Sequence, residues 1–528
     1  MFTLSGAHVF PMYDGAVKAD PPMRLVDVRH EPTAVFAAEA TGKLTRRPGL
    51  AVLTAGPGVT NAVSPIAQAY FAGSPLLVIG GRAPTTRWGS GSLQELDHPP
   101  VLAPVSKQSG TVHDVSEIAD RVDEALTTAS SPHRGPAFLD VPMDQLFSHA
   151  EVTLPGLPQH RRLEPDGDSL RVIAHLLAKS CRPVLVLGTD VWADGAEEAA
   201  LRFVDATGVA VITNGMGRGV IPRGHPSLVT KARSVALGQC DLAVVVGTPL
   251  DFRLGYGSFG GKQQAPRAQV VHIADTPGQV SRHATLAGSA CGDLTSGLDG
   301  LLAALESSHP ARPDWSPWTD RLRDLVSIET AKDAELLTSV SEPIHPARIY
   351  GELIPRLAEN SVVIGDGGDF VSFAGRYVEP ARPGGWLDPG PYGCLGAGLG
   401  AAMAARIARP SAQVVLLLGD GAAGMSLMDV DTLVRHQLPV VMVVGNNSCW
   451  GLEKHPMRFL YGYDVATDLA PQTAYDEVAQ ALGAAGEAVT KPEDIGAALD
   501  RAFASGVSYL VNVMTDPEAA YPRATTGV

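Results

Sequence analysis

Gly419-Asp420-Gly421 and Asn446-Asn447 place one carboxylate and a pair of carboxamides on the chain with 24 residues between the two motifs. The stretch between them reads as a helix followed by a buried strand at 438–445. Ends of neighbouring parallel strands meet at one crevice of a doubly wound sheet. The spacing therefore predicts that these oxygen donors converge. Such a set suits Mg²⁺ or Ca²⁺, and Mg²⁺ often shares its ligands with phosphate. The flanking glycines let backbone approach a phosphate group.

The elements that must position these residues form three α/β units. Strand-like runs alternate with helical stretches, which predicts parallel sheets. The runs are 24–28, 50–54, 76–79 and 137–141, then 184–187, 209–213, 242–246 and 270–273, then 361–364, 413–418, 439–444 and 509–513. We expect three consecutive doubly wound parallel-sheet domains at 1–150, 165–306 and 343–528. The chain starts on a strand-like stretch, so a helix expected before it is missing from this numbering.

Composition narrows the class of partner. The chain has 528 residues and a net charge of −15, which argues against nucleic acid and anionic membranes. Its five cysteines form no CxxC pair, which is typical of reduced thiols rather than a zinc site or a disulfide framework. No signal peptide or membrane span is visible in the sequence, so we expect a cytoplasmic protein.

The first unit contains two further motifs. Together with Arg29-His30-Glu31 and the segment Ala-Gly-Pro-Gly-Val-Thr-Asn at 55–61, the paired motifs at 419–421 and 446–447 resemble thiamine-diphosphate-dependent enzymes of the acetolactate synthase and 2-hydroxyacyl-CoA lyase superfamily. The resemblance covers essentially the whole chain. It implies a pyrimidine-binding domain, a middle nucleotide- or CoA-binding-like domain and a diphosphate-binding domain, in that order.

The resemblance also implies how thiamine diphosphate and Mg²⁺ would be held. Asp420 and Asn447 would ligate the metal through side chains, and Cys449 through its carbonyl. The other positions implied to contact the cofactor are Pro57, Asn61, Gly393, Leu395, Gly419, Gly421 and Ala422. Leu395 falls where the family places a bulky apolar residue under the bent cofactor. A second Gly-Asp-Gly, at 365–367, has no Asn-Asn pair after it and is interpreted as a strand-end turn.

Glu31 takes the activating position of this family. There a glutamate hydrogen-bonds the pyrimidine N1′ and favours the imino tautomer that deprotonates thiazolium C2. A carboxyl group suits the task because it can share a proton with a weakly basic ring nitrogen. In the family the first and third domains of different subunits face each other across the cofactor. We therefore expect at least a homodimer, and a homotetramer as the assembly.

The middle unit bears on the substrate. Residues 231–241 look like a segment of the acyl-CoA-using branch, whereas acetolactate synthases usually have a Gly/His-rich stretch there. Residues 210–270 hold seven bases against two acids, a net +5. Such a region suits the ADP part of coenzyme A, or FAD, with Arg218, Arg233 and Arg253 as candidate phosphate ligands. A solvated basic face is the alternative.

Four further residues are candidates on the substrate side. Gln94, in the loop 91–98, could hydrogen-bond a substrate carbonyl or hydroxyl, while Glu95 and His98 of the same loop could be surface residues. Glu477 could act as the base for a 2-hydroxy adduct. Its alternative is a glutamate that merely starts a helix.

These observations give three hypotheses. The first is a 2-hydroxyacyl-CoA lyase-type enzyme, a reversible carboligase that yields formyl-CoA and an aldehyde or ketone. The second is an acetolactate synthase catalytic subunit acting on pyruvate. The third is a catalytically silent binding homologue, which the joint presence of Glu31, Asp420 and Asn447 argues against.

Overall fold

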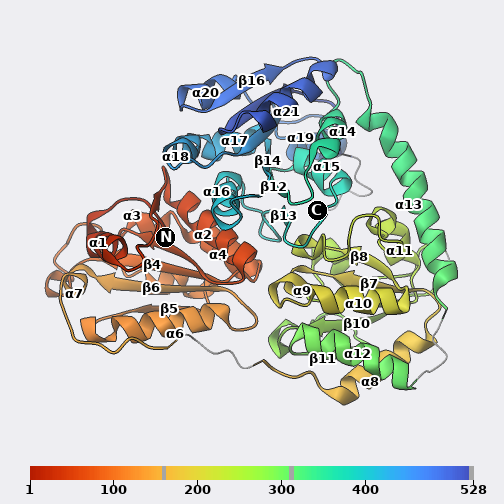
Figure 1. Ribbon diagram of the computed structural model, residues 1–528, viewed down its shortest axis with the longest axis horizontal. Coiled ribbons are helices and arrows are strands. Elements are labelled where there is room, and N and C mark those ends of the chain that lie inside the picture. Colours follow the sequence, from red (N-terminus) through yellow and green to blue (C-terminus); the bar gives the residue numbers. More distant parts are fainter. Residues whose placement is uncertain (157–161, 264, 309–313, 522–528) are drawn as a thin grey trace.

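Three parallel-sheet α/β domains lie around a common centre in the computed structural model (Figure 1). It describes residues 1–156, 162–263, 265–308 and 314–521. The prediction of three such domains is confirmed. The strands of the three sheets lie within 1–150, 165–306 and 343–528.

The first sheet has the strand order β2-β1-β3-β4-β6-β5, and every pairing in it is parallel. Its strands are β1 (Phe2–Thr3), β2 (Val26–Asp27), β3 (Gly49–Leu53), β4 (Leu76–Arg82), β5 (Gln108–Thr111) and β6 (Pro136–Pro142). The main covering helices are α2 (Glu31–Thr45), α4 (Val63–Phe71) and α6 (Ile118–Ser130). Sequence periodicity missed α1 (Phe10–Lys18) and the edge strand β5.

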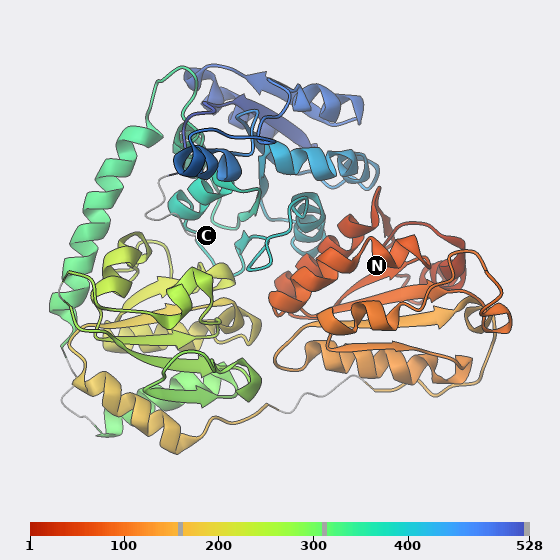
Figure 2. The ribbon, with the colours of Figure 1, turned by 180° about the vertical axis from the view of Figure 1, so that it is seen from behind.

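The middle sheet is parallel with the order β11-β10-β9-β7-β8. Its strands are β7 (Pro183–Leu187), β8 (Ala210–Thr213), β9 (Leu242–Val246), β10 (Gln269–Ala274) and β11 (Gly288–Cys291). Helices α8 (Gly167–Lys179), α10 (Glu197–Thr207) and α12 (Leu294–Ser308) pack together on it. The long helix α13 (Ser316–Leu337) then runs along the outside of the molecule toward the third domain (Figure 2).

The third sheet is also parallel, in the order β13-β12-β14-β15-β17-β16. Its strands are β12 (Val362–Asp366), β13 (Trp386–Leu387), β14 (Val414–Gly419), β15 (Val441–Asn446), β16 (Ala485–Val489) and β17 (Tyr509–Met514). The central strands β14 and β15 are almost wholly buried. Their apolar runs read correctly from sequence because both faces of a parallel sheet are covered.

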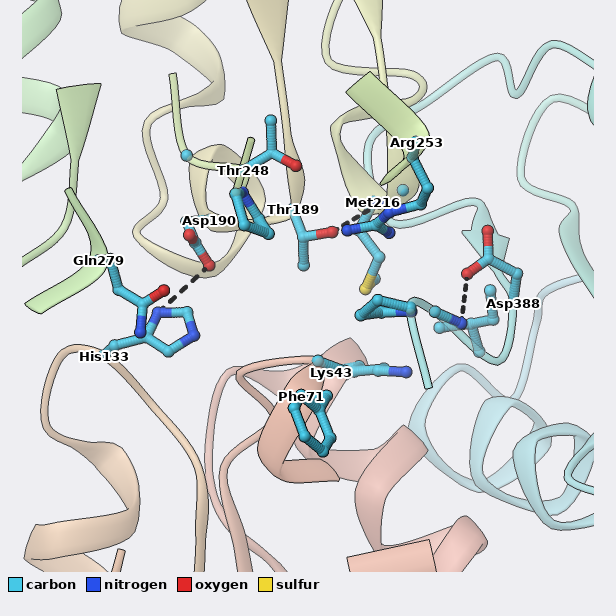
Figure 3. A pocket seen from close by; sticks show the side chains of 17 residues that line it. Lys43, Phe71, His133, Thr189, Asp190, Met216, Thr248, Arg253, Gln279 and Asp388 are labelled. Atoms are coloured by element: carbon cyan, nitrogen blue, oxygen red, sulfur yellow. Dashed lines mark hydrogen bonds and ion pairs between the residues drawn. The ribbon is translucent and has the colours of Figure 1, made fainter. Parts of the chain in front are cut away.

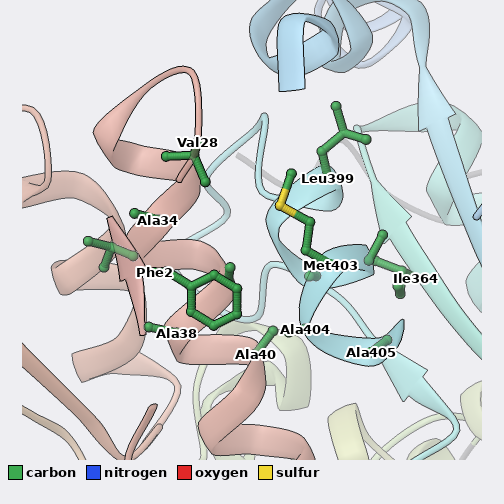
Figure 4. Packing of buried hydrophobic residues seen from close by; sticks show 14 of the residues in the cluster. Phe2, Val28, Ala34, Ala38, Ala40, Ile364, Leu399, Met403, Ala404 and Ala405 are labelled. Carbon is green, nitrogen blue, oxygen red and sulfur yellow. The ribbon is translucent and has the colours of Figure 1, made fainter. Parts of the chain in front are cut away.

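The first and third domains share one hydrophobic core. Helix α2 packs along α16 (Gly398–Ala408), where small residues let the two backbones approach closely (Figure 4). A Cβ added to Gly400 would lie 2.9 Å from the backbone nitrogen of Ala37. This contact fixes where α2, and hence Glu31 at its start, lies relative to the third domain.

None of the described helices combines the length and the apolar character that crossing a membrane requires.

Candidate functional site

The carboxyl ends of β14 and β15 bring the two opening motifs together. The strands are paired in parallel with Gly419 opposite Gly445, so Asp420 and Asn446 each follow directly at the same edge. Asp420 is the first residue of the short helix α17 (Asp420–Ser426). Asn446 turns away and donates to the carbonyl of Thr473 and to Asn512 Oδ1. Asn447 lines the cavity at this edge.

Asp420 is held at the bottom of that cavity with 3% of its surface exposed. Its Oδ1 accepts a bond from the Gly421 amide at 2.9 Å, and its Oδ2 accepts one from the Ser448 amide at 2.6 Å. Burial raises the pKa of Asp420 to about 6, because a charge removed from water lacks solvation. A cation would compensate this cost. The carboxylate, the Asn447 amide and the neighbouring carbonyls form the hard oxygen set that Mg²⁺ takes.

The cavity beside Asp420 is shaped by glycines. A Cβ on Gly421 would lie 2.4 Å from the Trp450 ring, and one on Gly445 would lie 2.4 Å from the Phe370 ring. Both glycines line the cavity, as do Gly419, Ala422, Gly393 and Leu395. A cleft with backbone exposed next to a helix start fits a phosphate-bearing group. The residues present therefore fit the diphosphate of thiamine diphosphate with its metal.

The second Gly-Asp-Gly motif also serves this site. Asp366 ends β12 and is fully buried, and its two carboxylate oxygens accept bonds from the amides of Gly396 at 3.1 Å and Gly398 at 2.7 Å. It thereby anchors the loop that carries Leu395. Gly367 of the same motif lines the cavity. The motif is a strand-end turn, as expected, and its structural task could not be read from sequence spacing.

Glu31 begins α2 and is 8% exposed. Asn61 Nδ2 donates to Glu31 Oε2 at 3.1 Å, and the turn containing Pro57 and Gly58 lies beside it. The structure thus brings together the three first-domain positions that the resemblance implied, Glu31, Pro57 and Asn61. The residues that line the cavity beside Asp420 all lie between Gly367 and Glu453 in the third domain. Glu31 is not among them.

The substrate loop differs from expectation at His98. Instead of being a surface residue, His98 is fully buried. Its Nδ1 lies 2.9 Å from Asp140 Oδ2, and its Nε2 accepts the Gly56 amide at 2.9 Å. It fixes the 55–58 turn beneath Glu31, a task that local sequence gives no sign of. Gln94 packs over that same turn, since a Cβ on Gly56 would lie 2.8 Å from Gln94 Cβ.

The two acidic candidates, Glu95 and Glu477, lie among residues of their own loop or helix. Glu95 accepts bonds from the amides of Gly89 and Ser92 within its own loop. Glu477 is exposed in the first turn of α20 (Tyr475–Ala481) and does not line the cavity beside Asp420. Its neighbour Asp476 is the buried acid and binds Asn512. The described contacts therefore favour a helix-start interpretation of Glu477.

The candidate phosphate ligands of the middle domain are largely engaged within the protein. Arg218 is buried, donates to the carbonyls of Gly375 and Val378, and stacks on Trp386 at 4.5 Å, so it joins the middle domain to the third. Arg253 makes a bidentate pair with Asp251, with Nε donating to Oδ1 at 3.2 Å and Nη2 donating to Oδ2 at 2.7 Å. Arg233 donates to the carbonyl of Arg253 at 2.6 Å. The excess of bases at 210–270 is thus not a free cationic surface at these three arginines.

An ionic cluster lines the crevice at the carboxyl ends of the middle sheet, and its His133 and Asp190 are labelled in Figure 3. Asp190, in α9 (Thr189–Ala193) after β7, and Asp275, after β10, face His133 of the first domain at 3.7 and 2.9 Å. Arg134 donates to Asp194 at 2.8 Å. Burial alone would lower the pKa of His133, but Asp190 and Asp275 raise it to about 9. Burial raises the pKa of Asp190 to about 7.

This crevice is where a nucleotide would bind in a doubly wound domain. A diphosphate placed there would face the buried carboxylates of Asp190 and Asp275, while the adjacent cations already have carboxylate partners. Placing like charges together in a buried site is costly. The residues present do not fit the diphosphate of FAD or of the ADP part of coenzyme A at this position.

Known proteins resemble the chain along its whole length. Sequence profiles for three parts of thiamine pyrophosphate enzymes match it, the N-terminal TPP binding domain at 1–101, the central domain at 170–301 and the C-terminal TPP binding domain at 366–513. It is 47% identical to the acetolactate synthase large subunit IlvG of Mycobacterium tuberculosis, over 99% of the chain and 94% of that protein. It is 33% identical to 2-hydroxyacyl-CoA lyase 2 of Caenorhabditis elegans, over 97% and 87% respectively. For the Homo sapiens protein of that name the values are 32%, 92% and 82%.

Proposed function

Since the chain belongs to the thiamine pyrophosphate enzymes, we propose that it makes carbon–carbon bonds from 2-keto acids, with acetolactate synthase chemistry on pyruvate. The observation that carries the proposal is the meeting of Asp420 and Asn447 at the ends of β14 and β15, in a glycine-lined cavity. When bound, thiamine diphosphate supplies a carbanion that attacks the keto group and stores the electrons released with CO₂.

The third domain would hold the cofactor by its charged end. Asp420, Asn447 and the carbonyl of Cys449 would bind Mg²⁺, and the amides of Gly421 and Ala422 would donate to the diphosphate. Leu395, on the loop anchored by Asp366, would support the cofactor from below. Because Gly421 and Gly445 have no room for a side chain beside the Trp450 and Phe370 rings, their backbone would stay open to the charged end of the cofactor.

Glu31 would exchange the activating proton at pyrimidine N1′. It is fit for this because it is nearly buried and keeps one carboxylate oxygen on Asn61. The other oxygen, Oε1, accepts no hydrogen bond from the residues that the structure describes. In this arrangement Asn61 orients the carboxyl and His98 fixes the turn beneath it. Glu31 would reach a cavity of another chain, since the cavity of its own chain is lined by the third domain.

The choice of a keto acid over an acyl-CoA rests on the middle domain. The sequence argument for coenzyme A used the segment 231–241 together with the excess of bases at 210–270, which would suit FAD as well. Arg218, Arg233 and Arg253 of that basic region have protein partners, so they support neither nucleotide. The 47% identity to an acetolactate synthase subunit supports the same choice. Acyl-CoA lyase chemistry is the second candidate, supported by the 2-hydroxyacyl-CoA lyase 2 relatives and by the segment 231–241.

One experiment separates the candidates. The purified protein, supplied with thiamine diphosphate and Mg²⁺, is given pyruvate in one assay and a 2-hydroxyacyl-CoA in another. Acetolactate and CO₂ in the first assay support the proposal. Formyl-CoA and aldehyde in the second, with no acetolactate in the first, would transfer the assignment to the lyase. Failure of the protein to bind thiamine diphosphate by calorimetry would refute both.

A further inference from the structure

Two hydrogen bonds donated to a single buried carboxylate, that of Asp429, lie on either side of Glu31 in the sequence. The Arg29 amide donates to Asp429 Oδ1 at 2.8 Å, and Thr33 Oγ1 donates to Asp429 Oδ2 at 2.6 Å. Arg29 and Thr33 lie two residues before and after Glu31. Asp429 belongs to the third domain, so the bonds cross from one domain to the other.

Asp429 is itself held firmly. It ends a short 3₁₀ turn, Leu427–Asp429, and is 2% exposed. Thr432 Oγ1 donates to its Oδ1 at 2.9 Å. Burial raises the pKa of Asp429, while the bonds from Thr33, Arg29 and Thr432 act in the opposite direction. Oδ1 thus accepts hydrogen bonds from Arg29 and Thr432, and Oδ2 accepts one from Thr33.

Asp429 lies nine residues after Asp420, the proposed metal ligand, and its position is tied to that of Asp420. Helix α17 is followed directly by the 3₁₀ turn Leu427–Asp429, with a bend at Ser426 between them. The first residue of α17 faces the diphosphate cavity and the last residue of the turn holds the Glu31 segment. Packing of α2 on α16 fixes the helix sideways, but the first turn of a helix lacks internal partners for its amides and is prone to fray. A polar contact at that turn supplies what the packing does not.

We propose that Asp429 is a positioning residue, which holds the Arg29–Thr33 backbone so that the Glu31 carboxyl keeps the direction it needs for proton exchange with the pyrimidine. The proposal rests on the role proposed above for Glu31. Without Asp429 the third domain remains intact and binds the diphosphate, but Glu31 is misdirected. A displacement of about 1 Å is enough to cost roughly 100-fold in rate.

The test compares Asp429→Ala with Thr33→Val, Asp429→Asn and Asp431→Ala in the full-length protein. Thr33→Val removes one of the two bracketing bonds. Asp429→Asn keeps an oxygen for the Arg29 amide. Asp431→Ala is the matched control, because Asp431 also bridges to Arg29, through its side chain at 3.8 Å, without touching the Glu31 backbone. Turnover, the Kd of thiamine diphosphate with Mg²⁺, and hydrogen–deuterium exchange of the peptide around residues 29–36 are measured, the last on the cofactor-free protein.

The expected result for Asp429→Ala is a fall in kcat of about 100-fold, with an unchanged cofactor Kd and faster amide exchange at 29–36. Thr33→Val should show the same pattern more weakly, Asp429→Asn should recover most of the activity, and Asp431→Ala should match the parent protein. Parent-like exchange and kcat in both Asp429→Ala and Thr33→Val would overturn the proposal. So would a loss of cofactor affinity that equals the loss of kcat. If Glu31→Gln keeps full activity, the proposed function fails, while the exchange measurement still decides whether Asp429 orders the segment.

Discussion

At the scale of single residues, the chemistry assigned to the chain depends on Glu31 and on the Asp420–Asn447 pair. Asp420 and Glu31 are both buried, and a buried carboxyl group costs free energy unless a partner offsets its lost hydration. Burial raises the pKa of Asp420, whose hydrogen-bond partners among the described residues are backbone amides, and Glu31 accepts a hydrogen bond from the Asn61 side-chain amide. Buried carboxyl groups without a cation in the chain are candidates for a ligand-binding role.

Glu31→Gln should lower turnover by about 100- to 10,000-fold, the usual contribution of a general acid–base group. The amide keeps the size of the side chain and its contact with Asn61, so the fold and the cofactor Kd should be unchanged. Steady-state assays with saturating cofactor measure the effect. Glu477→Gln is the matched control, expected to retain parent activity because Glu477 is exposed. A large loss in Glu477→Gln would instead establish it as a catalytic base.

Asp420→Ala should weaken Mg²⁺-dependent binding of thiamine diphosphate by more than about 10-fold, since even outer partners of metal ligands contribute that much. Calorimetric titration of the cofactor with and without Mg²⁺ measures it. Asp431→Ala, an acid farther along the same segment, should bind like the parent. Equal affinity in Asp420→Ala and the parent would remove Asp420 from the metal site.

At the scale of elements, the central strands were predictable, whereas four of the six edge strands were not. The four strands missed from sequence, β5, β11, β13 and β16, all lie at sheet edges. Edge strands are short, and β5 is nowhere fully buried, so they lack the apolar runs that identify buried parallel strands. The spacing between Asp420 and the Asn446-Asn447 pair could be interpreted from the sequence because the strands that lead to them, β14 and β15, are central and buried. The structural roles of His98, Asp366 and Asp429 could not be read from the sequence because each acts on a segment distant in sequence.

The ionic cluster between the loop after α6 and the ends of β7 and β10 should make stability depend on pH. His133 has a folded pKa of about 9, above its ordinary value of 6.5. A raised pKa means that its contribution is complete below about pH 6.5 and is lost as pH rises through about 9. The raised pKa of Asp190 acts with the same sign at lower pH. The stability measured by urea unfolding from pH 6 to 9.5 should therefore contain a fall with rising pH that depends on His133.

His133→Gln should flatten that profile and lower the stability at pH 6.5. His436, which pairs with the more exposed Asp27 at the other domain contact, offers the control substitution His436→Gln, which should leave the decline between pH 6.5 and 9 in place. An unchanged slope in His133→Gln would contradict the assignment.

At the scale of the whole molecule, the proposed site requires more than one chain. In each chain α2 is fixed against α16, while the cavity beside Asp420 is lined by the third domain alone. The first and third domains of one chain thus form a rigid unit whose two half-sites would be completed by a second copy. The shared core explains why the domains could be predicted separately from sequence while their mutual placement could not.

Mixing two inactive variants tests this central claim most directly. Glu31→Gln and Asp420→Ala proteins are co-refolded or co-expressed in equal amounts, and the carboligase activity of the mixture is compared with each alone. If Glu31 serves the cavity of a partner chain, every mixed dimer contains one site with both native residues. Random pairing in a two-fold dimer then restores about a quarter of the parent activity. If mixed dimers form, as shown by differently tagged chains, and activity stays at the level of the separate variants, the shared site is contradicted.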